Sequence, residues 1–143
     1  MLLYHFTQVH NLKNVGPENI LAVGLKPSVG QREFAILGLE PCVVWLTSDP
    51  LPPKPITDMW YGGEIRITVV IPSSDRKLVR LEKYLRRHGG RLDPSRYEGV
   101  SPSQLADSFK STYIYFGEIP RRQFRMVERS PHHAGDGDLG PSG

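Results

Sequence analysis

Hydrophobic and polar positions along the chain predict several short strands. The candidates are apolar, β-branched or alternating runs, and proline ends two of them because it has no N–H to donate to a ladder. They lie at 2–6, 42–47, 64–71, 112–119 and 124–127. The nearly continuous run at 42–47 is typical of a strand that is buried on both faces.

The first helical signal follows the first strand. Thr7 is a suitable N-cap for a helix over 8–15, which Gly16 and the proline after it interrupt. A second helical run over 18–23 ends at Gly24, which is placed to adopt a left-handed conformation. The sequence therefore predicts a broken helix between the first two strands.

Two further helices are predicted in the second half of the chain. Leu78, Leu81 and Leu85 have the spacing of one helix face, and Gly89 stops that helix. Ser101, followed by proline, is the cap of a second, short helix. With the strands, these elements predict an α+β fold: a small, mainly antiparallel sheet with a few short helices.

Loops and ends complete the predicted organisation. Loops over 26–40 and 49–63 are longer than is common in a small domain, which favours a role in shaping a binding site. Residues 129–143 are rich in Gly, Pro and His and contain one large aliphatic side chain. They predict a disordered tail behind a single domain over 1–128.

Composition excludes several classes of protein. The 143 residues contain no apolar run of the roughly 18–20 residues that a transmembrane helix needs. The first residues lack the basic and apolar regions of a secretory signal, so a cytoplasmic location is expected by default. The only cysteine, Cys42, excludes an internal disulfide and a zinc site of several cysteines. No metal site is predicted.

Charge is spread unevenly over a chain whose net charge is only +3. The stretch 76–96 contains eight basic residues against Glu82 and Asp93. A local excess of this kind suggests a polyanion partner such as nucleic acid or a phosphorylated ligand. Candidate nucleic-acid contacts are Arg80, Lys83, Arg86 and Arg87. The alternative interpretation is a solvated helix face.

Polar side chains stand where the first two strands end. His5 can donate and accept hydrogen bonds, and Thr7 combines a helix cap with a hydroxyl group. Such a pair suits the vicinal hydroxyls of a ribose. The alternative is that His5 bonds only to a backbone group and that Thr7 only caps a helix.

The order of these features resembles the ADP-ribosyltransferase superfamily. A strand ending His-x-Thr precedes a helix ending Ile-x-x-x-Gly-Leu-Lys-Pro, a variable loop and a strand ending Trp-Leu-Thr. The likeness is greatest to the branch with the RNA 2′-phosphotransferases and the DNA-targeting ADP-ribosyltransferase toxins. It covers residues 2–50, with a weaker likeness at 114–124. It implies a split antiparallel sheet whose halves grip NAD, the substrate, or an ADP-ribosyl group.

The resemblance also implies roles for residues. His5 would bond to a ribose hydroxyl, and the Phe6 backbone would hold the nicotinamide amide. Thr47 and Ser48 would belong to the second motif, and Trp60 or Tyr61 would stack on the nicotinamide. The candidate cofactor-binding residues are His5, Phe6, Thr7, Trp45, Ser48, Tyr61 and Arg66. We expect the His5 and Thr47 side chains to line one cleft.

One departure from the resemblance concerns catalysis. These transferases have a catalytic Glu on a late strand, where this chain has Thr112, and Glu118 follows six residues later. The candidate catalytic residues are therefore His5, Thr47, Thr112 and Glu118. The 2′-phosphotransferases lack that Glu and use Arg and His on phosphate, a role open here to Arg32, Arg66 or the basic stretch.

Three functions remain as hypotheses. The first is an NAD-dependent ADP-ribosyltransferase-like enzyme with a nucleic acid as candidate acceptor. The second is a module of the same fold that holds NAD, ADP-ribose or a nucleotide end without turnover. The third is a small phage or mobile-element protein that docks on a partner through Trp60 and Tyr61.

Overall fold

The computed structural model describes residues 1–8, 20, 24–25, 43–57, 63–89 and 99–131. These residues form one six-stranded sheet in the order β4-β5-β2-β1-β3-β6, and each neighbouring pair is antiparallel. The strands are β1 (Leu2–Thr7), β2 (Val44–Thr47), β3 (Ile65–Val70), β4 (Leu78–Arg80), β5 (Thr112–Tyr115) and β6 (Phe124–Arg129). The predicted α+β class with an antiparallel sheet is confirmed.

The helices of the described residues are short. They are α4 (Lys54–Ile56), α5 (Leu81–His88), α6 (Pro102–Ser111) and the 3-10 helix η3 (Arg121–Gln123). In this part of the chain, no helix has the length and hydropathy needed to cross a membrane.

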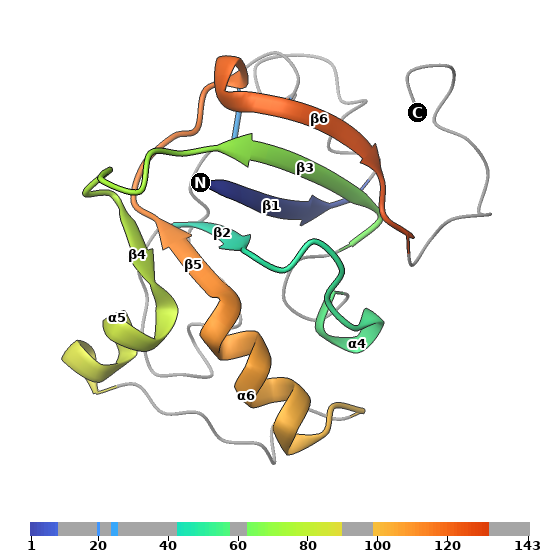
Figure 1. Cartoon of the computed structure of the whole chain (residues 1–143), viewed down its shortest axis with the longest axis vertical. Coiled ribbons are helices and arrows are strands. Elements are labelled where there is room, and N and C mark those ends of the chain that lie inside the picture. Colours follow the sequence, from blue (N-terminus) through green and yellow to red (C-terminus); the bar gives the residue numbers. More distant parts are fainter. Residues whose placement is uncertain (9–19, 21–23, 26–42, 58–62, 90–98, 132–143) are drawn as a thin grey trace.

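The sheet divides between β1 and β2. The register of β1 with β3 runs over six residue pairs, whereas that of β1 with β2 consists of Tyr4 opposite Thr47. In Figure 1, β6, β3 and β1 run together, while β5 and β4 cross the view in a steeper direction. The sheet therefore consists of two halves, β4-β5-β2 and β1-β3-β6. The strands that carry the predicted motifs, β1 and β2, meet at the junction of these halves.

The two faces of the sheet follow from strand alternation. Leu3 belongs to one hydrophobic cluster, together with Leu46, and defines the Leu3 face. Phe6 belongs to the other cluster, with Trp45, and defines the Phe6 face.

Different segments cover the two faces. Helices α5 and α6 cover the Phe6 face with Leu81, Leu85, Leu105 and Phe109. On the Leu3 face, Leu25 forms an antiparallel bridge with Ile119, and both side chains are buried. All four residues of β2 are buried, so this strand is covered on both faces, as the apolar run at 42–47 predicts.

One predicted helix begins later than its leucines suggest. Leu78 lies in β4 opposite Tyr115, so it does not share a helix face with Leu81 and Leu85. The short strand pairs with β5 before the chain turns into α5. Sheet pairing with a strand far along the chain has overridden the local helical spacing.

Both predicted ends of helices in the second half of the chain are confirmed. Gly89 ends α5 with a φ of 75° and donates its N–H to the Leu85 carbonyl. Ser101 begins α6 with a capping box, in which its hydroxyl accepts from the Gln104 N–H and its own N–H donates to the Gln104 side chain. The predicted left-handed Gly24 has a φ of 85°.

Several strand ends differ from the predicted ranges, and two of these differences change the place of a predicted feature. β5 ends at Tyr115, so Glu118 lies in the connection to η3 rather than in the strand. β6 includes Arg129, where the sequence predicts the tail to begin, and the Ser130 N–H donates to the Glu64 carbonyl. Residues 132–143 lie outside the described part of the chain.

Candidate functional site

His5 lies where the two sheet halves part. Its Nδ1 donates to the Trp45 carbonyl oxygen on β2 at 2.7 Å. By alternation its side chain is on the Leu3 face, next to Ile67 across the ladder with β3. A side chain thus links β1 to β2 near the single register pair that joins these strands.

The surroundings of His5 fix its protonation state. Burial lowers the pKa of His5 below the ordinary 6.5, and the hydrogen bond to Trp45 opposes this shift only in part. The ring is therefore neutral at pH 7. Because a carbonyl only accepts, the proton lies on Nδ1, and Nε2 carries a lone pair that can accept a hydrogen bond.

Thr47 and His5 do not line one cleft. Thr47 is opposite Tyr4, and neighbouring residues of a strand point to opposite faces, so Thr47 is on the Phe6 face and His5 on the Leu3 face. Thr47 is 1% exposed, and its Oγ1 accepts from the Asp49 N–H at 3.0 Å. The expectation of a shared cleft is wrong, although the two strands are neighbours.

The other motif residues of the first two strands have backbone or core positions. Phe6 and Trp45 are buried in the core of the Phe6 face. The Thr7 carbonyl accepts from the Glu64 N–H at 2.8 Å, and its side chain is buried. Ser48 is exposed, and its N–H donates to the Ser111 carbonyl at 2.9 Å, which ties the end of β2 to the end of α6.

Thr112 and Glu118, the two candidate catalytic residues at the late strand, differ in burial. Thr112 is buried opposite Thr47, and its Oγ1 donates to the Ser108 carbonyl, so it ends α6. Glu118 is exposed beyond the end of β5. In the described part of the chain, no hydrogen bond or ion pair joins His5 to a carboxylate.

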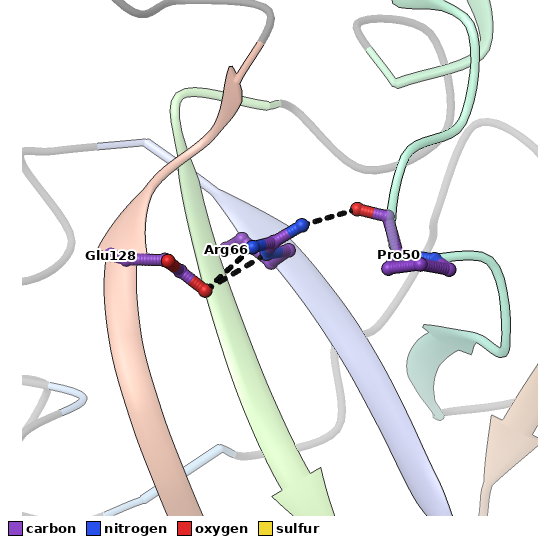
Figure 2. Close-up of polar contacts among 3 residues, drawn as sticks. All are labelled: Pro50, Arg66 and Glu128. Atoms are coloured by element: carbon purple, nitrogen blue, oxygen red, sulfur yellow. Dashed lines mark hydrogen bonds and ion pairs between the residues drawn. The ribbon is translucent and has the colours of Figure 1, made fainter.

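Arg66 connects the two sheet halves (Figure 2). Its Nε and Nη2 donate to Glu128 Oε1 on β6 at 3.1 and 2.7 Å, and its Nη1 donates to the Pro50 carbonyl at 2.6 Å. The guanidinium also lies 5.6 Å from the centre of the Tyr4 ring. By register the Arg66 side chain is on the Phe6 face, whereas His5 is on the Leu3 face. The guanidinium of Arg66 forms an ion pair with Glu128.

The basic stretch is exposed where the structure describes it. Arg80 ends β4, and its Nη2 donates to the Lys110 carbonyl at 3.2 Å. Lys83, Arg86 and Arg87 are exposed on α5. Of the other candidates, Arg32, Trp60, Tyr61 and the end of the basic stretch lie outside the described residues.

Sequence reasoning missed a cavity of about 300 Å³ beside α6. One wall is the segment 49–53, which contributes Asp49. The other wall is a polar face of α6 with Gln104, Asp107, Ser108 and Ser111. That helical spacing of polar residues is visible in the sequence, but only the fold brings the segment after β2 against it.

Comparison with known proteins gives no matching protein-family model, no matching curated protein and no matching solved structure.

Proposed function

We propose that the protein binds NAD or ADP-ribose, as an ADP-ribosyltransferase-like protein, beside His5 on the Leu3 face. The observation that carries this proposal is the state of His5. Its Nδ1 is held by the Trp45 carbonyl at the junction of the sheet halves, and the lowered pKa keeps the ring neutral. A ribose hydroxyl would donate to Nε2.

The arrangement of the sheet supports the same proposal. The resemblance implies a split sheet with the ligand between its halves. Here β1 and β2 share one register pair, and each continues into its own set of strands. A ligand at this junction would contact the ends of both motif strands, including the exposed Ser48.

Binding is supported better than transfer by the described residues. Thr112 ends a helix, and Glu118 is exposed beyond its strand. Thr112 has no carboxylate, and within the described ranges Glu118 has no hydrogen bond with His5 that would bring its carboxylate to an oxocarbenium-like ribose. We therefore propose binding of an ADP-ribosyl group as the function and treat transfer to an acceptor as a separate question.

Calorimetry tests the proposed binding, and product analysis tests whether the protein also transfers the ADP-ribosyl group. Titration of the full chain with ADP-ribose and with NAD should give saturable binding. Absence of binding of either ligand at about 10 mM would contradict the proposal. Release of nicotinamide from NAD, followed by chromatography with and without a DNA oligonucleotide, separates a transferase from a binding module.

We also propose, as a second candidate function, that α5 and β4 contact a polyanion such as nucleic acid. The observation that favours it is the exposure of Arg80, Lys83, Arg86 and Arg87 on adjoining elements, with Glu82 as the one acidic residue of α5. Binding of duplex and single-stranded DNA measured over a range of salt concentrations tests this function. Weakening with salt is expected because phosphate contacts release counterions.

A further inference from the structure

The cavity beside α6 is a separate feature from the His5 region. Its walls are the segment 49–53 and four α6 residues that share one helix face. α6 packs on the Phe6 face through Leu105 and Phe109, whereas His5 is on the Leu3 face. The cavity is lined by Asp49, Leu51, Pro52, Pro53, Gln104, Asp107, Ser108 and Ser111.

The segment that forms one wall is held in place from several directions. Asp49 donates its N–H to Thr47 Oγ1, and its Oδ1 accepts from the Leu51 N–H at 2.9 Å. Thr57 Oγ1 donates to the Pro52 carbonyl at 3.2 Å, and Arg66 donates to the Pro50 carbonyl. Hydrogen bonds within the chain therefore fix the conformation of this wall, which is typical of small-molecule sites.

The lining has a clear electrostatic character. Asp49 and Asp107 contribute carboxylates, and none of the described lining residues is Lys, Arg or His. Leu51 and the two prolines add an apolar wall. Such a site favours a ligand with a positive charge and an aliphatic part.

A buried hydroxyl in the same wall lacks a partner. Ser108 is 7% exposed, and its Oγ has no hydrogen-bond partner among the residues that the structure describes. Its carbonyl accepts from Thr112 and Ser111, so the backbone of this turn is satisfied while the hydroxyl is not. Buried polar groups without partners are rare in folded proteins, and one that lines a cavity indicates a missing donor or acceptor.

From these observations we infer that this cavity binds an alkylguanidinium or alkylammonium group. The N–H donors would bond to the carboxylates of Asp49 and Asp107, with the Ser108 hydroxyl as a further acceptor. The aliphatic chain would lie on Leu51 and the prolines. The same chemistry occurs in free amines and in Arg or Lys side chains of a peptide.

The test is a titration of the full chain followed by NMR, with probes of one shape and different charge. We expect n-butylguanidinium and n-butylammonium to shift the amide resonances of α6 and the segment 49–53, and neutral n-butylurea to leave them unchanged. Equal binding of n-butylurea, or no shifts at about 10 mM cation, would overturn the proposal.

Two variants locate the binding. The double variant Asp49→Asn and Asp107→Asn removes both charges, while the amide oxygen introduced in place of the Asp49 carboxylate can still accept from the Leu51 N–H. It should weaken n-butylguanidinium binding by about tenfold or more. Glu82→Gln removes a carboxylate on α5, outside the cavity lining, and is the control for a general loss of negative charge. Equal affinity in the double variant and the control would overturn the proposal.

A third arm separates the sources of the cation. A short capped peptide with one Arg is compared with n-butylguanidinium and with the same peptide carrying citrulline. Tighter binding of the Arg peptide would identify a protein segment as the natural ligand, and weaker binding would identify a free small molecule. Both results support the site, whereas equal binding of the citrulline peptide contradicts it.

Discussion

His5 has both of its ring nitrogens in defined chemical roles. Nδ1 donates to the Trp45 carbonyl at 2.7 Å, and this bond crosses the junction between the two sheet halves. Burial keeps the ring neutral by lowering its pKa. A neutral, oriented imidazole has one acceptor left, at Nε2, and this is the atom on which the proposed ribose contact depends.

The lowered pKa of His5 predicts how stability changes with pH. Below about pH 6.5 the unfolded chain binds a proton at His5 that the folded chain does not, so the free energy of unfolding should fall as the pH decreases. Above that pH this contribution should be constant. Urea unfolding from pH 5 to pH 8 measures the slope, which for one proton is at most about 1.4 kcal/mol per pH unit.

The His5→Asn variant is the control for this pH dependence. Asn keeps a side-chain N–H for the Trp45 carbonyl but does not titrate, so the slope below pH 6.5 should be smaller than in the wild type. The same slope in both proteins would assign the pH dependence to other groups.

At the scale of elements, Gly24 is the position where backbone conformation and close packing coincide. Its φ is 85°, its N–H donates to the Ile20 carbonyl at 2.8 Å, and the next residue bridges to Ile119. A Cβ placed at Gly24 would lie 2.3 Å from the Ile119 carbonyl oxygen. Glycine is therefore required by space as well as by conformation.

Gly24→Ala should lower the free energy of unfolding by more than about 2 kcal/mol, because conformational strain and a backbone clash add. Gly89→Ala is the matched control: its φ is 75°, but no atom of the described residues lies within 4 Å of the added Cβ. It should cost about 1 kcal/mol. Chemical denaturation measures both values, and equal losses would contradict the role given to the Ile119 contact.

The exposed cations of α5 predict an effect on polyanion binding. Arg86→Glu with Arg87→Glu should weaken DNA binding about equally for different sequences and reduce the slope of log K against log salt, by roughly 0.9 for each lost contact on duplex DNA. Arg121→Glu with Arg122→Glu makes the same change of charge on η3, outside the basic stretch. Equal effects of the two pairs would indicate only a response to net charge.

Helix ends were predictable from the sequence, and a short strand was not. Ser101 and Gly89 act within one turn of their helices, so local chemistry decides their positions. β4 depends on the partner strand β5, which comes more than thirty residues later. Because Leu78 also fits the spacing of a helix face, only the pairing with Tyr115 distinguishes the two structures.

At the scale of the whole molecule, Arg66 links the strands of one sheet half to the segment that follows β2 in the other (Figure 2). Its guanidinium bonds to Glu128 and to the Pro50 carbonyl. The side chains of Arg66 and Glu128 are 16% and 31% exposed, so solvent screens this ion pair only in part.

A double-mutant cycle with Arg66→Gln and Glu128→Gln measures the ion pair between β3 and β6, which holds the guanidinium that donates to the Pro50 carbonyl. We expect a coupling of about 1 kcal/mol in urea unfolding, at the upper end of the range for exposed pairs, because two N–H groups share one carboxylate oxygen in a partly buried position. A coupling below about 0.3 kcal/mol would mean that Glu128 does not stabilise the guanidinium of Arg66 in its position beside Pro50.

The candidate site was predictable as a pair of neighbouring strands but not as a set of converging side chains. The motifs placed His5 and Thr47 on strands that pair. Their faces depend on register, and a shift of one residue moves a side chain to the opposite face. The sequence also could not show that Arg66 is engaged by Glu128, because these residues are neighbours only in the assembled sheet.

The most direct test of the account compares ADP-ribose binding to the wild type, His5→Asn and His5→Gln by calorimetry, with thermal unfolding of each. Asn places its amide near Nδ1 and keeps the Trp45 bond, whereas Gln places its amide near Nε2. We expect His5→Asn to keep its stability and lose about tenfold in affinity, and His5→Gln to lose stability and keep more of the affinity. Unchanged ADP-ribose affinity in folded His5→Asn would contradict the proposed ribose contact and leave His5 as a structural link between β1 and β2.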